Sequence, residues 1–168
     1  MKKDFSKIKL FAMDVDGTLT DGKIYIGNDG EVMKAFNAKD GLGIKLLIKK
    51  GIVPIIITGR RSKIVTRRCE EIGITVLYQG VRDKGDILKN VMAKYDCTPE
   101  QTVYIGDDMN DLSAMQTAGI TFAPADCAAA LLPYVDFVLT QKSGDAPVRE
   151  AIDIILENRL TLSDYESI

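Results

Sequence analysis

The sequence contains no histidine. This absence excludes Ser-His-Asp and Cys-His hydrolases, and it excludes every metal site that uses imidazole ligands. Any catalysis must therefore use carboxylates, lysine, hydroxyl groups or a hard metal ion bound by oxygen ligands.

Cysteine is scarce, and its three positions do not form a motif. Cys69, Cys97 and Cys127 are far apart, odd in number and not arranged as C-x-x-C. This spacing excludes a disulfide framework and a thiolate zinc site, and it is typical of a reducing compartment. Because the lysine-rich N-terminal stretch precedes only the short run "LFAM", no signal peptide or membrane span is indicated. We therefore expect a cytoplasmic protein that does not enter a membrane.

Charge and length narrow the class of partner and the number of domains. The formal net charge is -2 and the pI is near 5.2, so the chain has no general attraction to nucleic acid. Small molecules or proteins are the expected partners. With 168 residues, 46% of them apolar, the chain can build one hydrophobic core, and we expect a single domain over residues 1–168.

Short β-branched runs alternate with helical patterns along the chain. The runs are 7–13, 52–58, 74–79, 102–106, 119–123 and 136–140. Helical spacing of apolar residues occurs near 40–51, 64–72, 87–95 and 148–157. The alternation predicts an α/β fold with a Rossmann-like, doubly wound parallel sheet. Residues 23–36 alternate between apolar and polar around Asn28-Asp29-Gly30, which predicts a β-hairpin insert.

Polar side chains follow four successive runs, at the sheet edge where ligands of such folds bind. They are Asp14 and Asp16; Thr58, Gly59 and Arg60; Lys84; and the stretch "GDDMND" from Gly106 to Asp111. Four strand ends thus bring carboxylates, a hydroxyl group and an ammonium group to one edge.

A magnesium site is predicted where Asp14 and Asp107 converge. Two carboxylates in one site repel unless a cation lies between them, and oxygen ligands without histidine favour Mg²⁺. Such a site suits a phosphorylated substrate. The alternative is that Asp14 and Asp16 only end a strand. An EF-hand loop is excluded, because Leu19 and Tyr25 stand where it needs glycine and glutamate.

These residue types support phosphoryl transfer through a carboxylate. We expect Asp14 to attack phosphorus and Asp16 to act as acid and base. Thr58, the Gly59 N–H at a helix start and Lys84 would hold the phosphoryl oxygens. Taken singly, Thr58 could be a helix N-cap and Lys84 a solvated helix residue.

The stretch "GDDMND" supplies the remaining carboxylates. Asp107 is the expected metal ligand. Asp108 and Asp111 would not bind the metal but would orient the waters bound to it, or the lysine. The alternative is acidic capping of the next helix, although three aspartates in five residues exceed what capping needs.

With these segments the chain resembles the haloacid-dehalogenase-type phosphotransferases, through "DVDGT", "TG", Lys84 and "GDDMND" in this order. Over nearly the whole chain, "DVDGTLTDG", "KDGLGIKLL", "IITGRRSKIVTRRCEEIGI", "YQGVRDK" and "YIGDDMND" resemble the small, capless members that hydrolyse 3-deoxy-D-manno-octulosonate 8-phosphate (KDO 8-phosphate).

That resemblance implies Mg²⁺ bound by Asp14, by the main-chain carbonyl of Asp16 and by Asp107. It implies an aspartyl-phosphate intermediate and a role in lipopolysaccharide biosynthesis. It also implies a homotetramer in which the hairpin packs the subunits together and a neighbour covers the site, because the chain has no cap domain.

Substrate choice within the family depends on basic residues. Arg60 matches the arginine of the octulosonate-type members, and a guanidinium group suits the carboxylate of a keto-acid sugar. Arg68 also matches the pattern of the family. The alternative substrate is a nonulosonate 9-phosphate, such as that of KDN or N-acetylneuraminate, or another sugar phosphate. The stretch "KSGDAPVRE" departs from the glycine-rich stretch of the family and keeps only Gly144. The resemblance implies that this stretch helps to shape the neighbouring active site. The departure therefore concerns substrate specificity and product release, but not the phosphoryl chemistry.

Two other classes remain open from the residues alone. A signalling receiver domain also has an acidic Mg²⁺ site, but its acceptor aspartate follows a later strand than Asp14 does. A catalytically silent binding domain of the same fold would hydrolyse no phosphomonoester.

Overall fold

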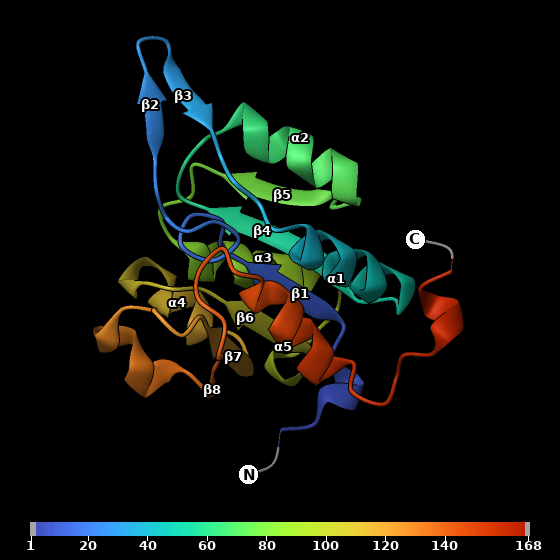
Figure 1. Ribbon diagram of the computed structural model, residues 1–168. Coiled ribbons are helices and arrows are strands. Elements are labelled where there is room, and N and C mark those ends of the chain that lie inside the picture. Colours follow the sequence, from blue (N-terminus) through green and yellow to red (C-terminus); the bar gives the residue numbers. More distant parts are fainter. Residues whose placement is uncertain (1–2, 167–168) are drawn as a thin grey trace.

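A six-stranded parallel sheet forms the centre of the computed structural model, which describes residues 3–166 (Figure 1). Its strand order is β5-β4-β1-β6-β7-β8, and each neighbouring pair is parallel. The strands are β1 (Leu10–Met13), β4 (Val53–Thr58), β5 (Val76–Gln79), β6 (Thr102–Ile105), β7 (Ile120–Ala123) and β8 (Phe137–Val138). Since the chain places β4 and β5 on one side of β1 and then β6 to β8 on the other, the strand order reverses at β1. The predicted doubly wound α/β fold is confirmed.

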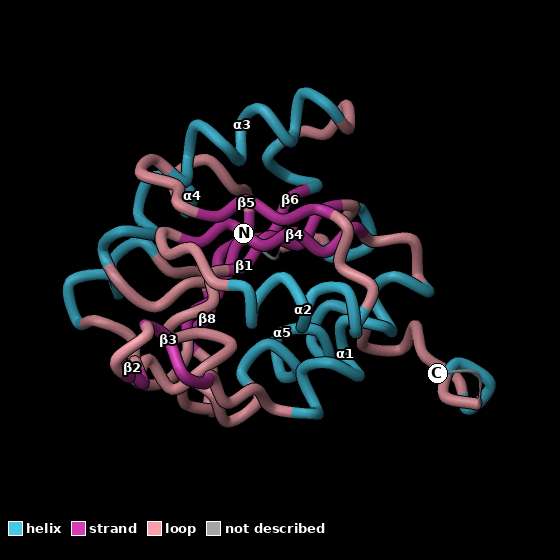
Figure 2. Tube along the Cα trace, turned by 90° about the horizontal axis from the view of Figure 1, so that it is seen from above, coloured by secondary structure: helices cyan, strands magenta, loops and turns pink. Residues whose placement is uncertain are grey.

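Helices cover both faces of the sheet. They are α1 (Ala38–Lys49), α2 (Lys63–Ile72), α3 (Lys84–Lys94), α4 (Leu112–Met115) and α5 (Pro147–Ile155). Figure 2 shows α3 and α4 on one face and α1, α2 and α5 on the other. Within residues 3–166 no helix is both long and apolar enough to cross a bilayer.

The central strands are apolar along their whole length because both of their faces are covered. In β1, Phe11 and Met13 enter the core formed with α1, α2 and α5, whereas Leu10 and Ala12 enter the core formed with α3 and α4. All four side chains are fully buried. This arrangement explains why short continuous β-branched runs identified the strands.

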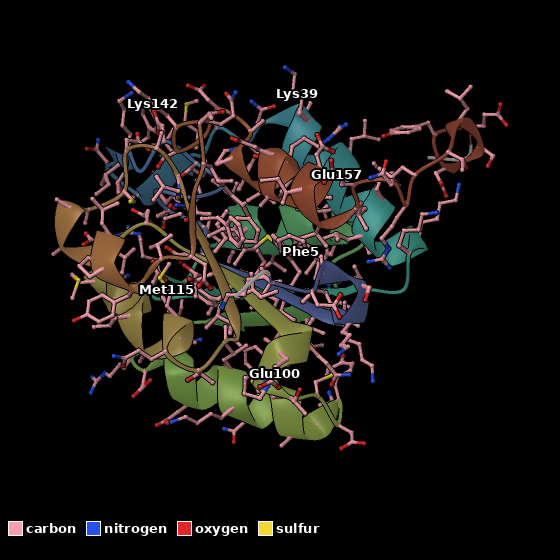
Figure 3. All side chains as sticks on the ribbon, turned by 90° about the horizontal axis from the view of Figure 1, so that it is seen from below. Phe5, Lys39, Glu100, Met115, Lys142 and Glu157 are labelled. Atoms are coloured by element: carbon pink, nitrogen blue, oxygen red, sulfur yellow. The ribbon has the colours of Figure 1, made fainter. Side chains whose placement is uncertain are left out.

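The N-terminal turn closes one end of the larger core with an aromatic cluster. The ring centroid of Phe5 lies 5.6 Å from that of Phe137 and 6.3 Å from that of Phe122. Figure 3 shows Phe5 among the side chains near the middle of this view, whereas Lys39 and Lys142 lie at its upper edge.

The predicted hairpin is present as β2 (Tyr25–Gly27) and β3 (Gly30–Met33). Gly30 has a φ of 111°, which a tight turn requires and glycine adopts without strain. The hairpin projects from the sheet in Figure 1 and carries exposed apolar side chains, namely Tyr25, Ile26, Val32 and Met33.

The stretch before α5 packs against the loop that follows β1. Ser143 Oγ donates a hydrogen bond to the carbonyl of Gly17, and Gly144 N donates to the carbonyl of Thr18 over 3.2 Å. A Cβ on Gly144 would lie 2.7 Å from the backbone nitrogen of Asp21, so this position accepts no side chain. The one glycine retained in "KSGDAP" therefore lies where a backbone approaches closely.

Asp40, in the first turn of α1, is a buried carboxylate outside the strand-end site. Its Oδ1 accepts the N–H of Arg149 over 2.7 Å, while Oδ2 has no hydrogen-bond partner. Burial raises the pKa of Asp40 from its ordinary value of 3.8 to about 7, against the opposing effects of the Arg149 N–H and the positive charges of Arg68 and Arg149. The folded protein therefore binds a proton here that the unfolded chain releases.

This difference predicts a pH dependence of stability. Between about pH 4 and pH 7 the folded state binds more protons than the unfolded state, so raising the pH through this range lowers the free energy of unfolding. Asp40→Asn keeps an oxygen for the Arg149 N–H and cannot titrate, so we expect a smaller decline than in the wild type. Urea unfolding from about pH 5 to pH 8 at saturating Mg²⁺ measures it; equal slopes in both proteins would contradict the assignment.

Candidate active site

The predicted strand-end residues meet at the carboxyl edge of β1, β4 and β6. Asp14 directly follows β1, Thr58 ends β4, Lys84 begins α3 and Asp107 lies just beyond β6. Asp14 is 3% exposed and Lys84 is 1% exposed. Charged groups buried to this degree require partners of opposite charge.

Lys84 bridges two carboxylates. Its Nζ lies 2.8 Å from Asp14 Oδ1 and 2.6 Å from Asp111 Oδ1. Burial by itself lowers the pKa of Lys84, but the charges of Asp14 and Asp111 and their hydrogen bonds outweigh burial and raise it. The ammonium form is therefore favoured, and the alternative of a solvated helix lysine is wrong.

Asp111 holds this bridge and the loop after β6. Its Oδ1 also accepts the hydroxyl of Tyr104 over 2.6 Å, and its Oδ2 accepts the N–H groups of Asp107 and Asp108 at 3.0 and 3.3 Å. Gly106 leaves room for it, since a Cβ there would lie 2.4 Å from the carboxylate. Both oxygens of Asp111 are therefore engaged by Lys84, by Tyr104 and by the loop. Its part in catalysis stays a prediction.

Three carboxylates crowd this edge. Oxygens of Asp14, Asp107 and Asp111 lie within 4.8 Å of one another. Burial, and then repulsion by Asp111, raises the pKa of Asp14 to about 6 although Lys84 acts in the opposite direction. Burial, and then the charges of Asp14 and Asp111, raises the pKa of Asp107 to about 7.

The cluster fits a hard divalent cation. When ionised, three carboxylates and one ammonium group leave two negative charges, which a divalent ion would neutralise. With Asp111 already saturated by hydrogen bonds, Asp14 and Asp107 are the two that could hold the ion. The donor set therefore matches the predicted magnesium site.

Gly17 lets the loop after β1 approach Asp107. It has a φ of 96°, and a Cβ there would lie 2.1 Å from Asp107 Oδ2. Thr18 Oγ1 donates to Asp107 Oδ1 over 3.3 Å. The backbone just after Asp16 thus packs on the Asp107 carboxylate. The Asp16 carbonyl as a metal ligand stays a prediction.

Asp16 lies between two basic side chains. Its Oδ1 forms an ion pair with Lys34 Nζ, and its Oδ2 lies 3.8 Å from Arg60 Nε. Lys34 is not among the site residues predicted from the sequence, because its contact with Asp16 joins residues 18 positions apart and requires the hairpin to fold back over the first loop. No motif in the sequence indicates this contact.

Thr58 is buried at the end of β4, but the expectation that Gly59 begins a helix is wrong. The helix α2 begins at Lys63, and its N-cap is Ser62, whose Oγ accepts the N–H of Val65 over 3.3 Å. The backbone after β4 is held instead by hydrogen bonds to the turn after β5, where Val81 N donates to the Thr58 carbonyl and Gly80 N to that of Arg60. Thr58 is therefore not an N-cap either.

The predicted substrate arginines lie in different places. Arg60 is half exposed beside Asp16. Arg68 forms an ion pair with Glu71 over 3.0 Å and lies over the ring of Phe36. The structure thus places Arg60 beside Asp16, whereas Arg68 contacts Glu71 and Phe36. Asp108 caps the short turn Met109–Asp111 by accepting the Met109 N–H, whereas Asp111, at the N-cap of α4, makes no side-chain cap hydrogen bond.

Fold and site together define the class of haloacid dehalogenase-like hydrolases, and the model of that family matches residues 73–152. The 3-deoxy-D-manno-octulosonate 8-phosphate phosphatase of Yersinia pestis is 46% identical over 151 residues, which cover 90% of this chain and 81% of the relative. The chain therefore belongs to the family of 3-deoxy-D-manno-octulosonate 8-phosphate phosphatases.

Solved structures of this family are similar throughout. The phosphatase from Moraxella catarrhalis, in complex with magnesium, phosphate and KDO, has a TM-score of 0.88 at 40% identity and covers 91% of this chain and 88% of its own. The cobalt-bound phosphatase from Haemophilus influenzae has a TM-score of 0.91 at 36% identity, covering 96% and 98%.

We predict that Mg²⁺ stabilises the protein more at pH 8 than at pH 5. In the metal-free protein Asp14 and Asp107 keep protons to about pH 6 and pH 7, so stability falls as the pH rises through their folded pKa values. Mg²⁺ needs the ionised carboxylates, so it raises the melting temperature chiefly above pH 7. Thermal unfolding with Mg²⁺ or a chelator measures both effects.

Asp107→Asn should abolish the Mg²⁺ shift while leaving the metal-free protein at least as stable at pH 8, because it removes one repelling charge. Asp86→Asn, on the exposed face of α3, is the matched control and should keep the full shift. A normal Mg²⁺ shift in Asp107→Asn would rule out Asp107 as a ligand.

Proposed function

We propose that this protein hydrolyses 3-deoxy-D-manno-octulosonate 8-phosphate to KDO and phosphate, with Mg²⁺ and through an aspartyl-phosphate at Asp14. The observation that carries the proposal is the buried bridge from Asp14 through Lys84 to Asp111, beside the Asp107 carboxylate. The 46% identity to the Yersinia pestis phosphatase and the KDO bound in the Moraxella catarrhalis structure support this substrate.

Asp14 and Asp107 would hold the metal ion, together with the main-chain carbonyl of Asp16. When bound, Mg²⁺ offsets the negative charge of the phosphoryl group and of the carboxylates that face it.

Asp14 is the nucleophile. Because Lys84 engages Oδ1, the other oxygen, Oδ2, is the one available to form the bond to phosphorus. As this bond forms, the bond from phosphorus to the sugar oxygen breaks. Water then attacks phosphorus, phosphate leaves, and the Asp14 carboxylate is restored.

Asp16 moves the protons. It donates one to the sugar oxygen as that oxygen leaves, and it then accepts one from the attacking water. Lys84, Thr58 and the Gly59 N–H hold the phosphoryl oxygens, where charge must be offset in the transition state. Asp108 and Asp111 orient the waters of the metal and the Lys84 side chain without binding the metal themselves.

Arg60 is the residue on which the choice of substrate rests. Its half-exposed guanidinium group lies beside Asp16, where the sugar would leave, and it suits the carboxylate of a keto-acid sugar. Arg68 contacts Glu71 and Phe36 instead.

The domain organisation, the cellular location and the assembly of the protein are part of the same proposal. Residues 1–168 act as one domain without a cap, in the cytoplasm, as a homotetramer that contributes to lipopolysaccharide biosynthesis. The exposed apolar side chains of the hairpin support the assembly, because such groups gain stability when a second copy covers them.

Phosphate release from KDO 8-phosphate, with Mg²⁺ and with a chelator, tests the proposed function. A nonulosonate 9-phosphate and common sugar phosphates serve as comparisons. We expect strong Mg²⁺-dependent preference for KDO 8-phosphate. Preference for another ester would discard this substrate, and no release from any ester would favour a silent or receiver-like protein.

Asp14→Asn should reduce kcat on the order of a thousandfold or more with folding intact, because the amide cannot form the phosphoenzyme. The control Asp86→Asn should retain wild-type turnover. Circular dichroism checks that the variant is folded. Rapid quench of the enzyme with labelled substrate shows whether the phosphoenzyme forms. Full turnover in Asp14→Asn would exclude Asp14 as the nucleophile.

A further inference from the structure

Lys34, just beyond β3, is a buried cation next to the proposed acid and base. Its side chain is 1% exposed, and its Nζ forms ion pairs with Asp16 Oδ1 and with Glu31 Oε1, the latter over 3.0 Å. With two carboxylates as partners and almost no exposed surface, Lys34 has no access to a substrate. Its place in the structure therefore concerns Asp16 itself.

Glu31 connects this ion pair to the segment after β4. Its Oε2 accepts the hydroxyl of Ser62, the N-cap of α2, and the Ser62 N–H donates to Gln79 Oε1 over 2.7 Å. Although burial acts in the opposite direction, the hydrogen bonds from Ser62 and Lys34 hold the pKa of Glu31 below its ordinary value. Lys34 is thus braced by a carboxylate that is itself anchored to the sheet edge.

The two oxygens of Asp16 have different surroundings. Oδ1 is paired with the buried Lys34, whereas Oδ2 faces the half-exposed Arg60 at 3.8 Å, beyond hydrogen-bond distance. Oδ2 is therefore the oxygen left to exchange a proton with a substrate. A buried, multiply bonded ion pair fixes geometry, because any other position of the Asp16 carboxylate would cost the buried ammonium group one of its two carboxylate partners.

We propose that Lys34 is a positioning residue, braced by Glu31 and Ser62, that fixes Oδ1 of Asp16 so that Oδ2 faces the leaving oxygen of the substrate. This inference rests on the proposed function, in which Asp16 is the acid and base. It makes the hairpin a part of the catalytic apparatus of its own chain.

The test compares two leaving groups. A sugar alkoxide needs a proton as it leaves, whereas p-nitrophenolate is weakly basic and leaves without one. Lys34→Met keeps the apolar stem and removes the ammonium group. We expect it to slow formation of the phosphoenzyme from KDO 8-phosphate on the order of a hundredfold, but formation from p-nitrophenyl phosphate by no more than a few-fold, as rapid quench with each ester measures. This first step is the one compared, because Asp16 also activates the water of the second step, which the two esters share.

Two further variants frame this result. Asp16→Asn should show the same imbalance between the two substrates, and larger. Lys23→Met is the matched control, since Lys23 forms an exposed ion pair with Asp21 at the base of the hairpin; it should behave as the wild type on both esters. The Mg²⁺ thermal shift reports whether each variant keeps a folded site. If Lys34→Met does not fold, Glu31→Gln removes the brace and should show the same imbalance to a smaller degree.

Each outcome separates this inference from the proposed function. Equal losses in the rate of phosphoenzyme formation from the two esters, or no loss, would overturn the positioning role of Lys34 while leaving the phosphatase in place. If the wild type hydrolyses the aryl ester and a different sugar phosphate, the proposed substrate is wrong. The loss that Lys34→Met causes on that sugar phosphate, compared with its loss on p-nitrophenyl phosphate, then still decides the role of Lys34. If the wild type hydrolyses no ester, both proposals fail.

Discussion

The ammonium group of Lys84, buried between Asp14 and Asp111, is the interaction on which the site depends. It ties the start of α3 to the end of β1 and to the loop beyond β6. Without it, two carboxylates would be buried without a cation, which is strongly unfavourable. With it, the edge carries two negative charges once its three carboxylates are ionised, so the same arrangement that stabilises the fold also favours binding of a divalent ion.

The loop after β1 is held from three directions by segments far away in the sequence. Lys34 from the hairpin binds Asp16, Asp107 packs against Gly17, and Ser143 donates to the Gly17 carbonyl. Such support matters for the proposed function, in which a nucleophile and an acid two residues apart must approach one phosphate group from different sides. The fold supplies the loop, and these contacts supply its conformation.

Much of this arrangement could be predicted from the sequence because its signals are local. Strands buried on both faces are continuous apolar runs, and parallel strands bring Asp14 and Asp107 to one edge. The prediction failed at Gly59, because the helix start depends on the competition between Thr58 and Ser62 as caps, and Ser62 also has Glu31 as a partner. Lys34 could not be found, since its contact with Asp16 forms only when the hairpin folds over the first loop. No local pattern places Arg68 over Phe36 instead of beside Asp16.

A crystal structure of the protein with Mg²⁺ and beryllium fluoride, which mimics a phosphoryl group on a carboxylate oxygen, tests the central claim most directly. The account predicts beryllium bonded to Asp14 Oδ2, with Lys84 still joining Oδ1 to Asp111 and with Mg²⁺ on Asp14 and Asp107. Beryllium bonded to Asp16, or a Lys84 side chain turned away from Asp14, would contradict it.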